Sequence, residues 1–181
     1  MSTCPARTFP PQAPRHAPAL AAVAAALVLT AILPVAAQAD ITGHPRIVDG
    51  DTLAFGRARV RIFGIDAPEA AQTCLDRQSL PYACGTAATQ AMRAIIADHD
   101  LDCRERDIDR YGRTVAQCFA GSLDIGRELV REGWAVAFRR YSRLYDPDEA
   151  EARAADRGIW SGRFQWPWDW RREHRAQQRT R

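Results

Sequence analysis

Three short segments combine carboxylates with arginines, the side chains that handle phosphate. They are residues 49–52 (Asp-Gly-Asp-Thr), 61–69 (ending Asp-Ala-Pro-Glu) and 109–113 (Asp-Arg-Tyr-Gly-Arg). Carboxylates can hold a hard cation or take a proton, and guanidinium groups clamp phosphate oxygens. Each segment alone is typical of a turn or a hairpin tip. It is their conjunction that indicates metal-assisted chemistry on a phosphate.

The first two segments lie among predicted strands. Ile47 and Val48 lead into an Asp-Gly turn, and residues 52–55 and 60–65 follow as apolar strands. Arg59 and Arg61 interrupt the second strand, and arginines in a buried strand must face a cleft or a partner. Five extended residues span about 16 Å, so Arg61 and Asp66 can meet only if the barrel curves.

The rest of the chain predicts helices around one hairpin. Apolar residues at helical spacing follow a Thr86 cap, and a hairpin with arms 101–104 and 114–119 carries the 109–112 tip. A second helix is expected from Asp124 to Gly133 and a third from an Asp146 cap to Gly158. The fold class is therefore α+β, mainly β: a small Greek-key barrel with three packed helices.

The N-terminal residues 1–39 predict a secretory signal peptide cleaved after Ala39. They contain no acid, and residues 17–37 are almost wholly apolar. An uncleaved membrane anchor is the alternative, since the run is about as long as a spanning helix. We expect a secreted or periplasmic protein with one domain over 40–162. Removing the leader takes away two of 25 basic and none of 22 acidic residues, so the net charge falls from +3 to about +1.

Four cysteines remain after that cleavage. An even number in an exported chain indicates two disulfides, with three possible connectivities. Spacing favours Cys103 with Cys118 across the hairpin and Cys74 with Cys84 around a local loop. A metal site is the alternative, although the chain has no Cys-x-x-Cys pair near them.

The C-terminal tail, residues 163–181, has its own composition. It holds six arginines against two acids, and the chain contains no lysine, so arginine is its phosphate-binding cation. Phe164, Trp166, Trp168 and Trp170 alternate, which predicts an extended segment with the rings on one side. The rings could stack on unpaired bases or simply bury area on the domain. We expect the last ten residues to be disordered.

Residues 45–160 strongly resemble the staphylococcal-nuclease-like family, the thermonucleases. The most specific parts of the resemblance are residues 48–52, 61–69 and 109–113. It implies a five-stranded OB-fold barrel with three helices and a calcium-dependent phosphodiesterase site. The chain has Ala67 where many relatives have threonine, which should matter little because the backbone carbonyl is the ligand there.

The resemblance also assigns roles to individual residues. It implies that Arg61, Glu69 and Arg113 are catalytic, with Glu69 as the base near the ion. It implies Asp51, Asp66 and the carbonyl of Ala67 as Ca²⁺ ligands, with Asp49 as a supporting acid. Substrate contacts are assigned to Arg110, Tyr111 and Tyr141. Arg139 falls where a second tyrosine is expected, which leaves base preference open. Oxygen ligands for a hard cation and guanidinium forks for a phosphate fit these roles chemically.

We therefore expect a monomeric exported nuclease that hydrolyses DNA and RNA with little sequence preference, gives 3'-phosphate ends and favours single strands. The alternative from another class is a non-catalytic OB-fold nucleic-acid-binding module of the cell envelope. Such a module should lack one of Arg61, Glu69 and Arg113, and all three are present. A disulfide-bridged scaffold whose acids serve only turns is the third interpretation. Membrane association follows only if the leader stays uncleaved.

Overall fold

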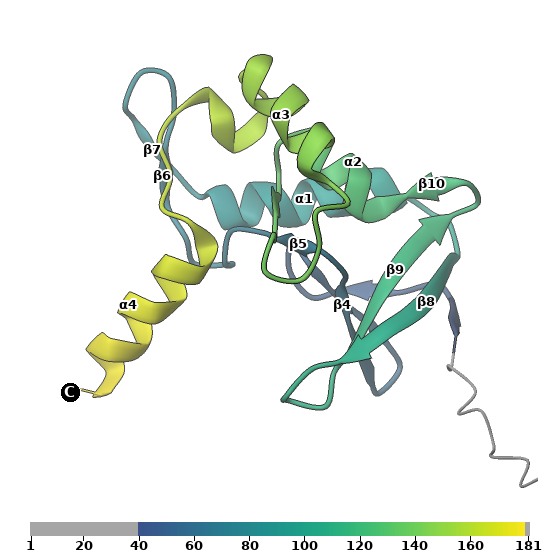
Figure 1. Ribbon diagram of the computed structural model, residues 1–181. Helices are drawn as coiled ribbons and strands as arrows, with labels where there is room; N and C mark the ends of the chain where they lie inside the picture. Colours follow the sequence, from purple (N-terminus) through teal and green to yellow (C-terminus); the bar gives the residue numbers. More distant parts are fainter. Residues whose placement is uncertain (1–39, 180–181) are drawn as a thin grey trace, which may run out of the picture. The chain divides into compact units, whose positions relative to one another are not determined.

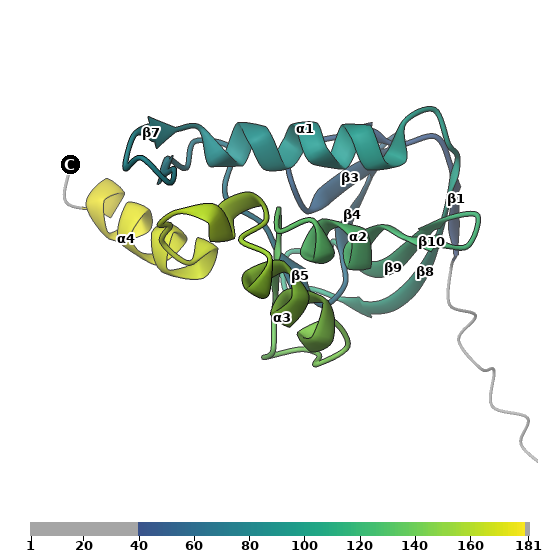
Figure 2. The same cartoon turned by 90° about the horizontal axis from the view of Figure 1, so that it is seen from above.

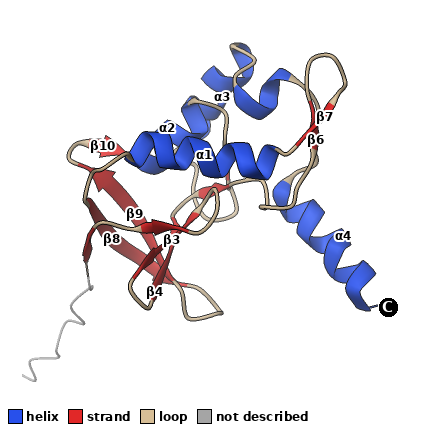
Figure 3. Cartoon of the chain, turned by 180° about the vertical axis from the view of Figure 1, so that it is seen from behind, coloured by secondary structure: helices blue, strands red, loops and turns tan. Residues whose placement is uncertain are grey.

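The structure, a computed structural model, describes residues 40–179 and is built on one curled sheet (Figure 3). The strand order is β1-β8-β9-β4-β3-β2, and β10 pairs with β9. All pairs are antiparallel except β4 with β9. The strands are β1 Ile41–Gly43, β2 Arg46–Ile47, β3 Thr52–Phe55, β4 Ala58–Ile62, β8 Leu101–Ile108, β9 Thr114–Ala120 and β10 Leu123–Asp124.

The first three helices lie on one side of this sheet, whereas the C-terminal helix lies apart from it, and short ladders join the remaining segments (Figures 1 and 2). Helix α2 packs against α1, α3 and strand β9. The helices are α1 Cys84–Ile96, α2 Ile125–Arg131, α3 Asp146–Ala154, the 3₁₀ helix η1 Gly158–Ser161 and α4 Pro167–Arg179. The ladders pair β5 (Ile65–Asp66) with β11 (Val136–Ala137), and β6 (Cys74–Leu75) with β7 (Pro81–Tyr82).

The core lies between the sheet and the helices. Apolar strand residues such as Leu53 and Ile62 pack with Met92 of α1 and Leu129 of α2, and all four are buried. Tyr145 is also fully buried, and its hydroxyl lies 3.1 Å from both carboxylate oxygens of Asp124. That carboxylate also accepts the Arg127 N–H and so caps α2. The core therefore fixes the start of α2 against the sheet.

The predicted α+β, OB-like fold class is confirmed, while the helix count and several boundaries were wrong. Helix α1 begins at Cys84 rather than after Thr86, because the disulfide and a hydrogen bond from Gly85 N to Gln72 O hold the chain there. Helix α3 has Tyr145 rather than Asp146 at its cap, and it ends before Gly158 because Asp156 already has a positive φ of 50°.

The tail differs most from expectation. Residues 167–179 form a fourth helix, α4, in place of an extended and then disordered segment. Pro167 suits the first helical turn, and no glycine or further proline interrupts the next twelve residues. The aromatic alternation therefore gives way to helical spacing after Trp166. The predicted leader and its cleavage site lie outside the described residues. Within residues 40–179, no helix has the length and apolarity that crossing a bilayer requires.

Both predicted disulfides are present. Cys74 pairs with Cys84, and Cys103 pairs with Cys118 across the β8–β9 hairpin, where the two residues are also register partners. The metal-site alternative is therefore wrong for these cysteines, because their sulfurs are bonded to each other. The first disulfide ties the first residue of β6 to the first residue of α1.

Replacing Cys74 and Cys84 by serine should lower the free energy of unfolding by roughly 2–3 kcal/mol, because the unfolded chain regains the freedom of a closed loop. Urea unfolding followed by tryptophan fluorescence measures this loss. The matched control replaces Cys103 and Cys118, which lie in an already hydrogen-bonded hairpin. Amide exchange in residues 69–84 should accelerate in the first variant only; equal acceleration in both would contradict the local role of the Cys74–Cys84 bond.

Candidate active site

A break in the predicted strand lets Arg61 reach Asp66. Strand β4 ends at Ile62, the chain turns at Gly64 with a φ of +73°, and β5 begins at Ile65. Positive φ favours glycine, and a Cβ there would also come 3.2 Å from the Tyr145 ring. The prediction of one nearly unbroken strand was therefore wrong. The turn removes the 16 Å separation of an extended chain and brings Arg61 Nη2 to 2.6 Å from Asp66 Oδ1.

One guanidinium joins two buried carboxylates. Arg61 Nη2 also lies 2.9 Å from Asp51 Oδ2, and Nη1 donates to Asp51 Oδ1 at 3.3 Å. Asp51 accepts two further hydrogen bonds, from the Thr52 hydroxyl (2.9 Å) and from Ala67 N (3.2 Å). The Arg61 side chain is only 17% exposed, and Asp66 is fully buried. A cation between these two acids is therefore part of the folded structure.

Burial and charge set the protonation of the acids. Burial would raise the pKa of Asp51, but the charge of Arg61 and the hydrogen bonds from Thr52 and Ala67 hold that pKa below its usual value. Burial, only partly offset by Arg171 and reinforced by the charge of Asp51, raises the pKa of Asp66 to about 6. Burial and then Asp51 likewise raise the pKa of Asp49 to about 6. Asp51 is therefore the most firmly ionised of the three.

Glu69 lies beside this pair and is held by the C-terminal helix. Arg171 of α4 donates to Glu69 Oε1 at 2.5 Å and to both oxygens of Asp66, at 3.0 and 2.7 Å. The Glu69 side chain is 31% exposed. The carboxylates of Asp66 and Glu69 thus share one guanidinium, as those of Asp51 and Asp66 share Arg61.

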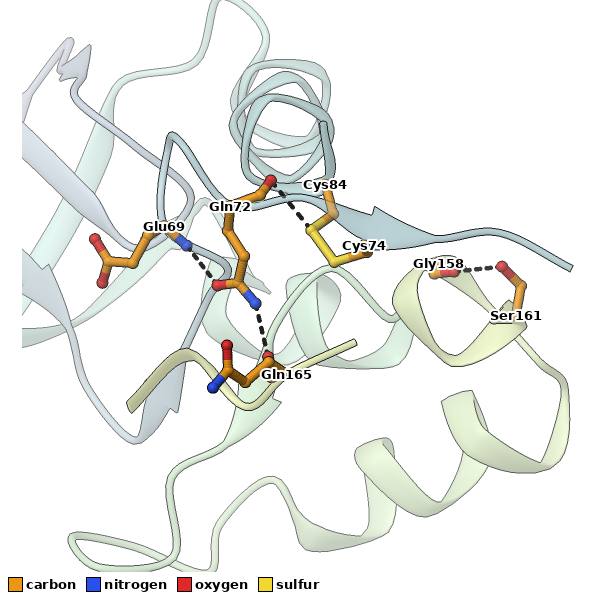
Figure 4. The surroundings of a disulfide bond; sticks show 7 residues. All are labelled: Glu69, Gln72, Cys74, Cys84, Gly158, Ser161 and Gln165. Atoms are coloured by element: carbon orange, nitrogen blue, oxygen red, sulfur yellow. Dashed lines mark hydrogen bonds between the residues drawn. A yellow bond between two sulfur atoms is a disulfide. The ribbon is translucent and has the colours of Figure 1, made fainter. Parts of the chain in front are cut away.

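The backbone around Glu69 is fixed by buried contacts (Figure 4). Gln72 is fully buried, and its side-chain oxygen accepts the Glu69 N–H at 3.2 Å while its amide donates to Gln165 O at 2.6 Å. Cys84 Sγ lies 3.4 Å from Gln72 O. Gly85 packs directly under the Glu69 carbonyl, where a Cβ would overlap it. The start of α1, the disulfide and the C-terminal segment together hold the Glu69 loop.

Arg113 is oriented by Asp109 at the tip of the β8–β9 hairpin. Asp109 Oδ2 accepts Arg113 Nε at 2.7 Å, and Oδ1 accepts the backbone N–H groups of Tyr111 and Arg113 at 2.9 and 3.0 Å. Although slight burial opposes it, these bonds lower the pKa of Asp109. Arg110 lies over the Tyr111 ring and donates to its hydroxyl at 2.7 Å. One acid thus shapes the turn and aims the arginine.

Most of these groups border one cleft of about 550 Å³. Nine of the predicted site residues line it, all within the described part of the chain: Asp49, Asp51, Arg61, Ala67, Glu69, Arg110, Tyr111, Arg113 and Tyr141. Asp66 does not reach the cleft wall, because Arg61 and Arg171 cover it. Arg139, which stands where the resemblance expects a second tyrosine, pairs with Asp146 and Glu149 and does not line the cleft.

Sequence reasoning missed several of the groups that shape the cleft. Asp109 had a usable signal, because an Asp three residues before a glycine is typical of a side-chain-capped turn. Gln72, Arg140, Arg171 and Arg175 had none, since their positions depend on tertiary packing. Arg171 in particular reaches the site from more than a hundred residues along the chain.

The donor set suits a hard divalent cation, although it is small. In residues 40–179, no group of three or more His, Cys, Asp or Glu side chains gathers in a metal-binding arrangement. The carboxylates of Asp51 and Asp66 nevertheless converge on one cationic nitrogen. Oxygen ligands of this kind, supplemented by carbonyls, waters and phosphate, are what Ca²⁺ takes. The place already attracts positive charge, so the residues fit an ion.

Comparison with known proteins agrees with this geometry. Residues 59–162 match the family model described as "Staphylococcal nuclease homologue". The chain is 37% identical over 173 residues to the Micrococcal nuclease of Shigella flexneri, covering 85% of this chain and 92% of that protein. It is 35% identical over 144 residues to the Succinoglycan biosynthesis protein ExoI of Rhizobium meliloti (strain 1021), covering 78% and 74%.

A third relative is the Probable staphylococcal-like nuclease CAN2 of Oryza sativa subsp. japonica, 35% identical over 140 residues, which are 75% of this chain and 35% of that protein. The chain belongs to the staphylococcal nuclease homologue family. The relatives that are named nucleases support a nuclease function for this chain, that is, a hydrolase that acts on nucleic acid. The matched range holds Arg61, Asp66, Glu69 and Arg113 but ends before α4.

Replacing Arg61 by methionine should destabilise the protein by about 3 kcal/mol, because two buried acids lose the cation between them. Arg59→Met is the matched control, since Arg59 lies two residues away in the same strand and is exposed; it should change stability by no more than about 0.5 kcal/mol. Urea unfolding of both variants measures the difference. Equal stabilities would show that Arg61 does not compensate these acids.

Asp109→Asn should lower kcat for nucleic acid by about tenfold or more, because Arg113 loses its charged partner while the amide oxygen still accepts the turn N–H groups. Asp109→Ala removes both contacts and should also loosen the hairpin tip, seen as faster amide exchange at residues 109–113. Kinetics on denatured DNA test the first effect. Unchanged kcat in Asp109→Asn would separate Asp109 from the positioning of Arg113.

Proposed function

We propose that the protein is an exported, Ca²⁺-dependent nuclease that hydrolyses phosphodiester bonds of DNA and RNA with little sequence preference and leaves 3'-phosphate ends. One observation carries this proposal. Asp51, Arg61, Glu69 and Arg113 line one cleft, and Asp66 lies behind its wall, bound to Arg61 and Arg171. Two disulfides within the described residues suit an oxidising compartment and so support export.

Asp51, Asp66 and the carbonyl of Ala67 would hold the ion, which polarises a phosphoryl oxygen when bound. Glu69 would take a proton from a water that attacks phosphorus on the side opposite the 5'-oxygen. Arg171 occupies Oε1 of Glu69, and Oε2 has no hydrogen bond within residues 40–179, so one oxygen is open to water. The bond to the 5'-oxygen then breaks, that oxygen takes up a proton, and the phosphate stays on the 3' side.

Arg61 and Arg113 would hold the non-bridging phosphate oxygens while charge builds on them. Guanidinium groups suit this task because they form paired hydrogen bonds to phosphate. Asp109 keeps the fork of Arg113 in place before substrate arrives, so little reorganisation is needed. Arg61 is held likewise by Asp51 and Asp66.

Single strands are the proposed substrate form. Tyr111 and Tyr141 line the cleft and are 65% and 63% exposed, so they can stack on unpaired bases. Stacking and phosphate contacts tolerate any base, which accounts for the proposed lack of sequence preference. A base in a closed duplex cannot present its face to these rings.

The test incubates the full chain with denatured DNA, with Ca²⁺ or with a chelator. Cleavage should require Ca²⁺, and Glu69→Gln or Arg113→Ala should lower kcat by about a hundredfold or more. Arg59→Met serves as the folded control with normal activity, since Arg59 is exposed and does not line the cleft. Chelator-resistant cleavage would contradict the metal role. Binding without cleavage by the wild type would favour the non-catalytic binding module.

A further inference from the structure

The C-terminal helix α4 is attached to the domain next to the catalytic groups. Backbone bonds of 2.8 and 2.9 Å pair Leu75 with Arg163, and Gln72 holds Gln165 O. Trp160, Phe164 and Trp166 then pack edge to face with centroids 4.9 to 5.8 Å apart, and Trp168 stacks on Trp166 at 4.8 Å. These contacts fix the start of α4 before Arg171 meets Asp66 and Glu69.

One face of α4 forms part of the cleft wall. Trp168, Arg171 and Arg175 line the cleft, and their spacing of three and four residues puts them on one side of a helix. Arg172 lies off that wall and pairs with Asp169 at 2.8 Å. The helix therefore presents a ring and two guanidinium groups to the space where the proposed reaction takes place.

Three of the six arginines that line the cleft have no acidic partner among the described residues, and one of these, Arg110, still donates to the Tyr111 hydroxyl. Arg61, Arg113 and Arg171 are each bound to carboxylates. The side chains of Arg140, in the segment after β11, and of Arg175 in α4 have no ion pair or hydrogen bond to another residue in the range 40–179, and both residues are exposed. An exposed guanidinium at a cleft, without an internal counterion, is suited to an anionic ligand from outside.

Aromatic rings accompany these two cations. The ring centroid of Phe138 lies 5.2 Å from that of Tyr141 and 5.5 Å from that of Trp168. The three rings therefore join the segment after β11 to α4 along the cleft. Rings interleaved with arginines are the composition of a surface that follows a single strand, because bases stack while phosphates pair. A flexible anionic peptide would use the arginines but leave the rings unused.

We propose that α4 and the segment after β11 form an extension of the substrate groove, in which Arg140 and Arg175 bind phosphates of a single-stranded nucleic acid beyond the scissile bond. The proposal rests on the proposed function for its substrate class. Arg171 links this extension to the catalytic groups, because it lies on the same face of α4 as Arg175 and also binds Glu69. Helix α4, which forms one side of this extension, lies outside the residues that the family model matches.

The experiment measures binding of a fluorescein-labelled oligothymidylate by anisotropy, with the full chain in chelator so that no cleavage occurs. Arg140→Ala and Arg175→Ala should each raise Kd about fivefold to tenfold at low salt. Each should also reduce the slope of log K against log salt by about 0.7, the value of one phosphate contact on a single strand. In the double variant, the reduction in slope should be about twice as large as in either single variant.

The matched controls are Arg172→Ala on the same helix and Arg143→Ala near Arg140, both paired with acids and off the cleft wall. They should keep the wild-type Kd and slope. Wild-type binding by Arg140→Ala and Arg175→Ala, or equal losses in the controls, would overturn the proposal. Thermal unfolding of every variant checks that the fold is intact.

Cleavage kinetics separate this proposal from the nuclease proposal. Arg175→Ala should lower kcat/KM on a long strand while leaving kcat/KM on a trinucleotide unchanged, because the short substrate does not extend as far as Arg175. A wild type that binds as described but never cleaves would refute the nuclease and leave the groove. A wild type that cleaves, with Arg175→Ala equal to it on both substrates, would refute the groove and leave the nuclease.

Discussion

The site depends on the placement of two buried carboxylates, Asp51 and Asp66, around one guanidinium nitrogen. Ionised acids this close repel each other and lose hydration, so they are stable only with a cation between them. Arg61 supplies that cation, and Arg171 adds a second on the side of Glu69. The fold thereby keeps a cluster of acids beside a cleft whose lining is rich in arginine. A divalent ion and a phosphate need these opposite environments side by side.

Four separate elements must hold their positions for this arrangement to form. Gly64 turns the chain so that β4 and β5 present Arg61 and Asp66 to the same point. The start of α1 fits under the Glu69 carbonyl only because residue 85 has no side chain. The hairpin tip carries Arg113, aimed by Asp109, and α4 returns from the end of the chain to meet Glu69. The disulfide between Cys74 and Cys84 stabilises the loop that carries Glu69, and the contacts of Glu69 with α1 and with α4 both depend on that loop.

The residue types at the site were predictable from the sequence, and much of their geometry was not. Asp51, Arg61, Glu69 and Arg113 stand in short segments whose chemistry points to phosphate, and local turn signals place those segments at strand ends. The convergence of Arg61 and Asp66 depended on the turn at Gly64, which an apolar run of strand formers conceals. The fourth helix was missed because alternating tryptophans imitate a strand, while the packing of Trp166 and Trp168 on the domain decides the outcome. No local pattern could have shown that Arg171 reaches Asp66.

The proposed ion and the arginines would compete for the same carboxylate oxygens, so a structure with the ion bound is the direct test of this account. A crystal structure of the chain with Ca²⁺ and a nucleoside 3',5'-bisphosphate would locate the ion by its anomalous signal. The account predicts a single ion about 2.3–2.6 Å from oxygens of Asp51 and Asp66, with the phosphate between the ion and Arg113. An ion bound elsewhere, or Asp51 and Asp66 still bridged by Arg61 with no ion at saturating Ca²⁺, would contradict it.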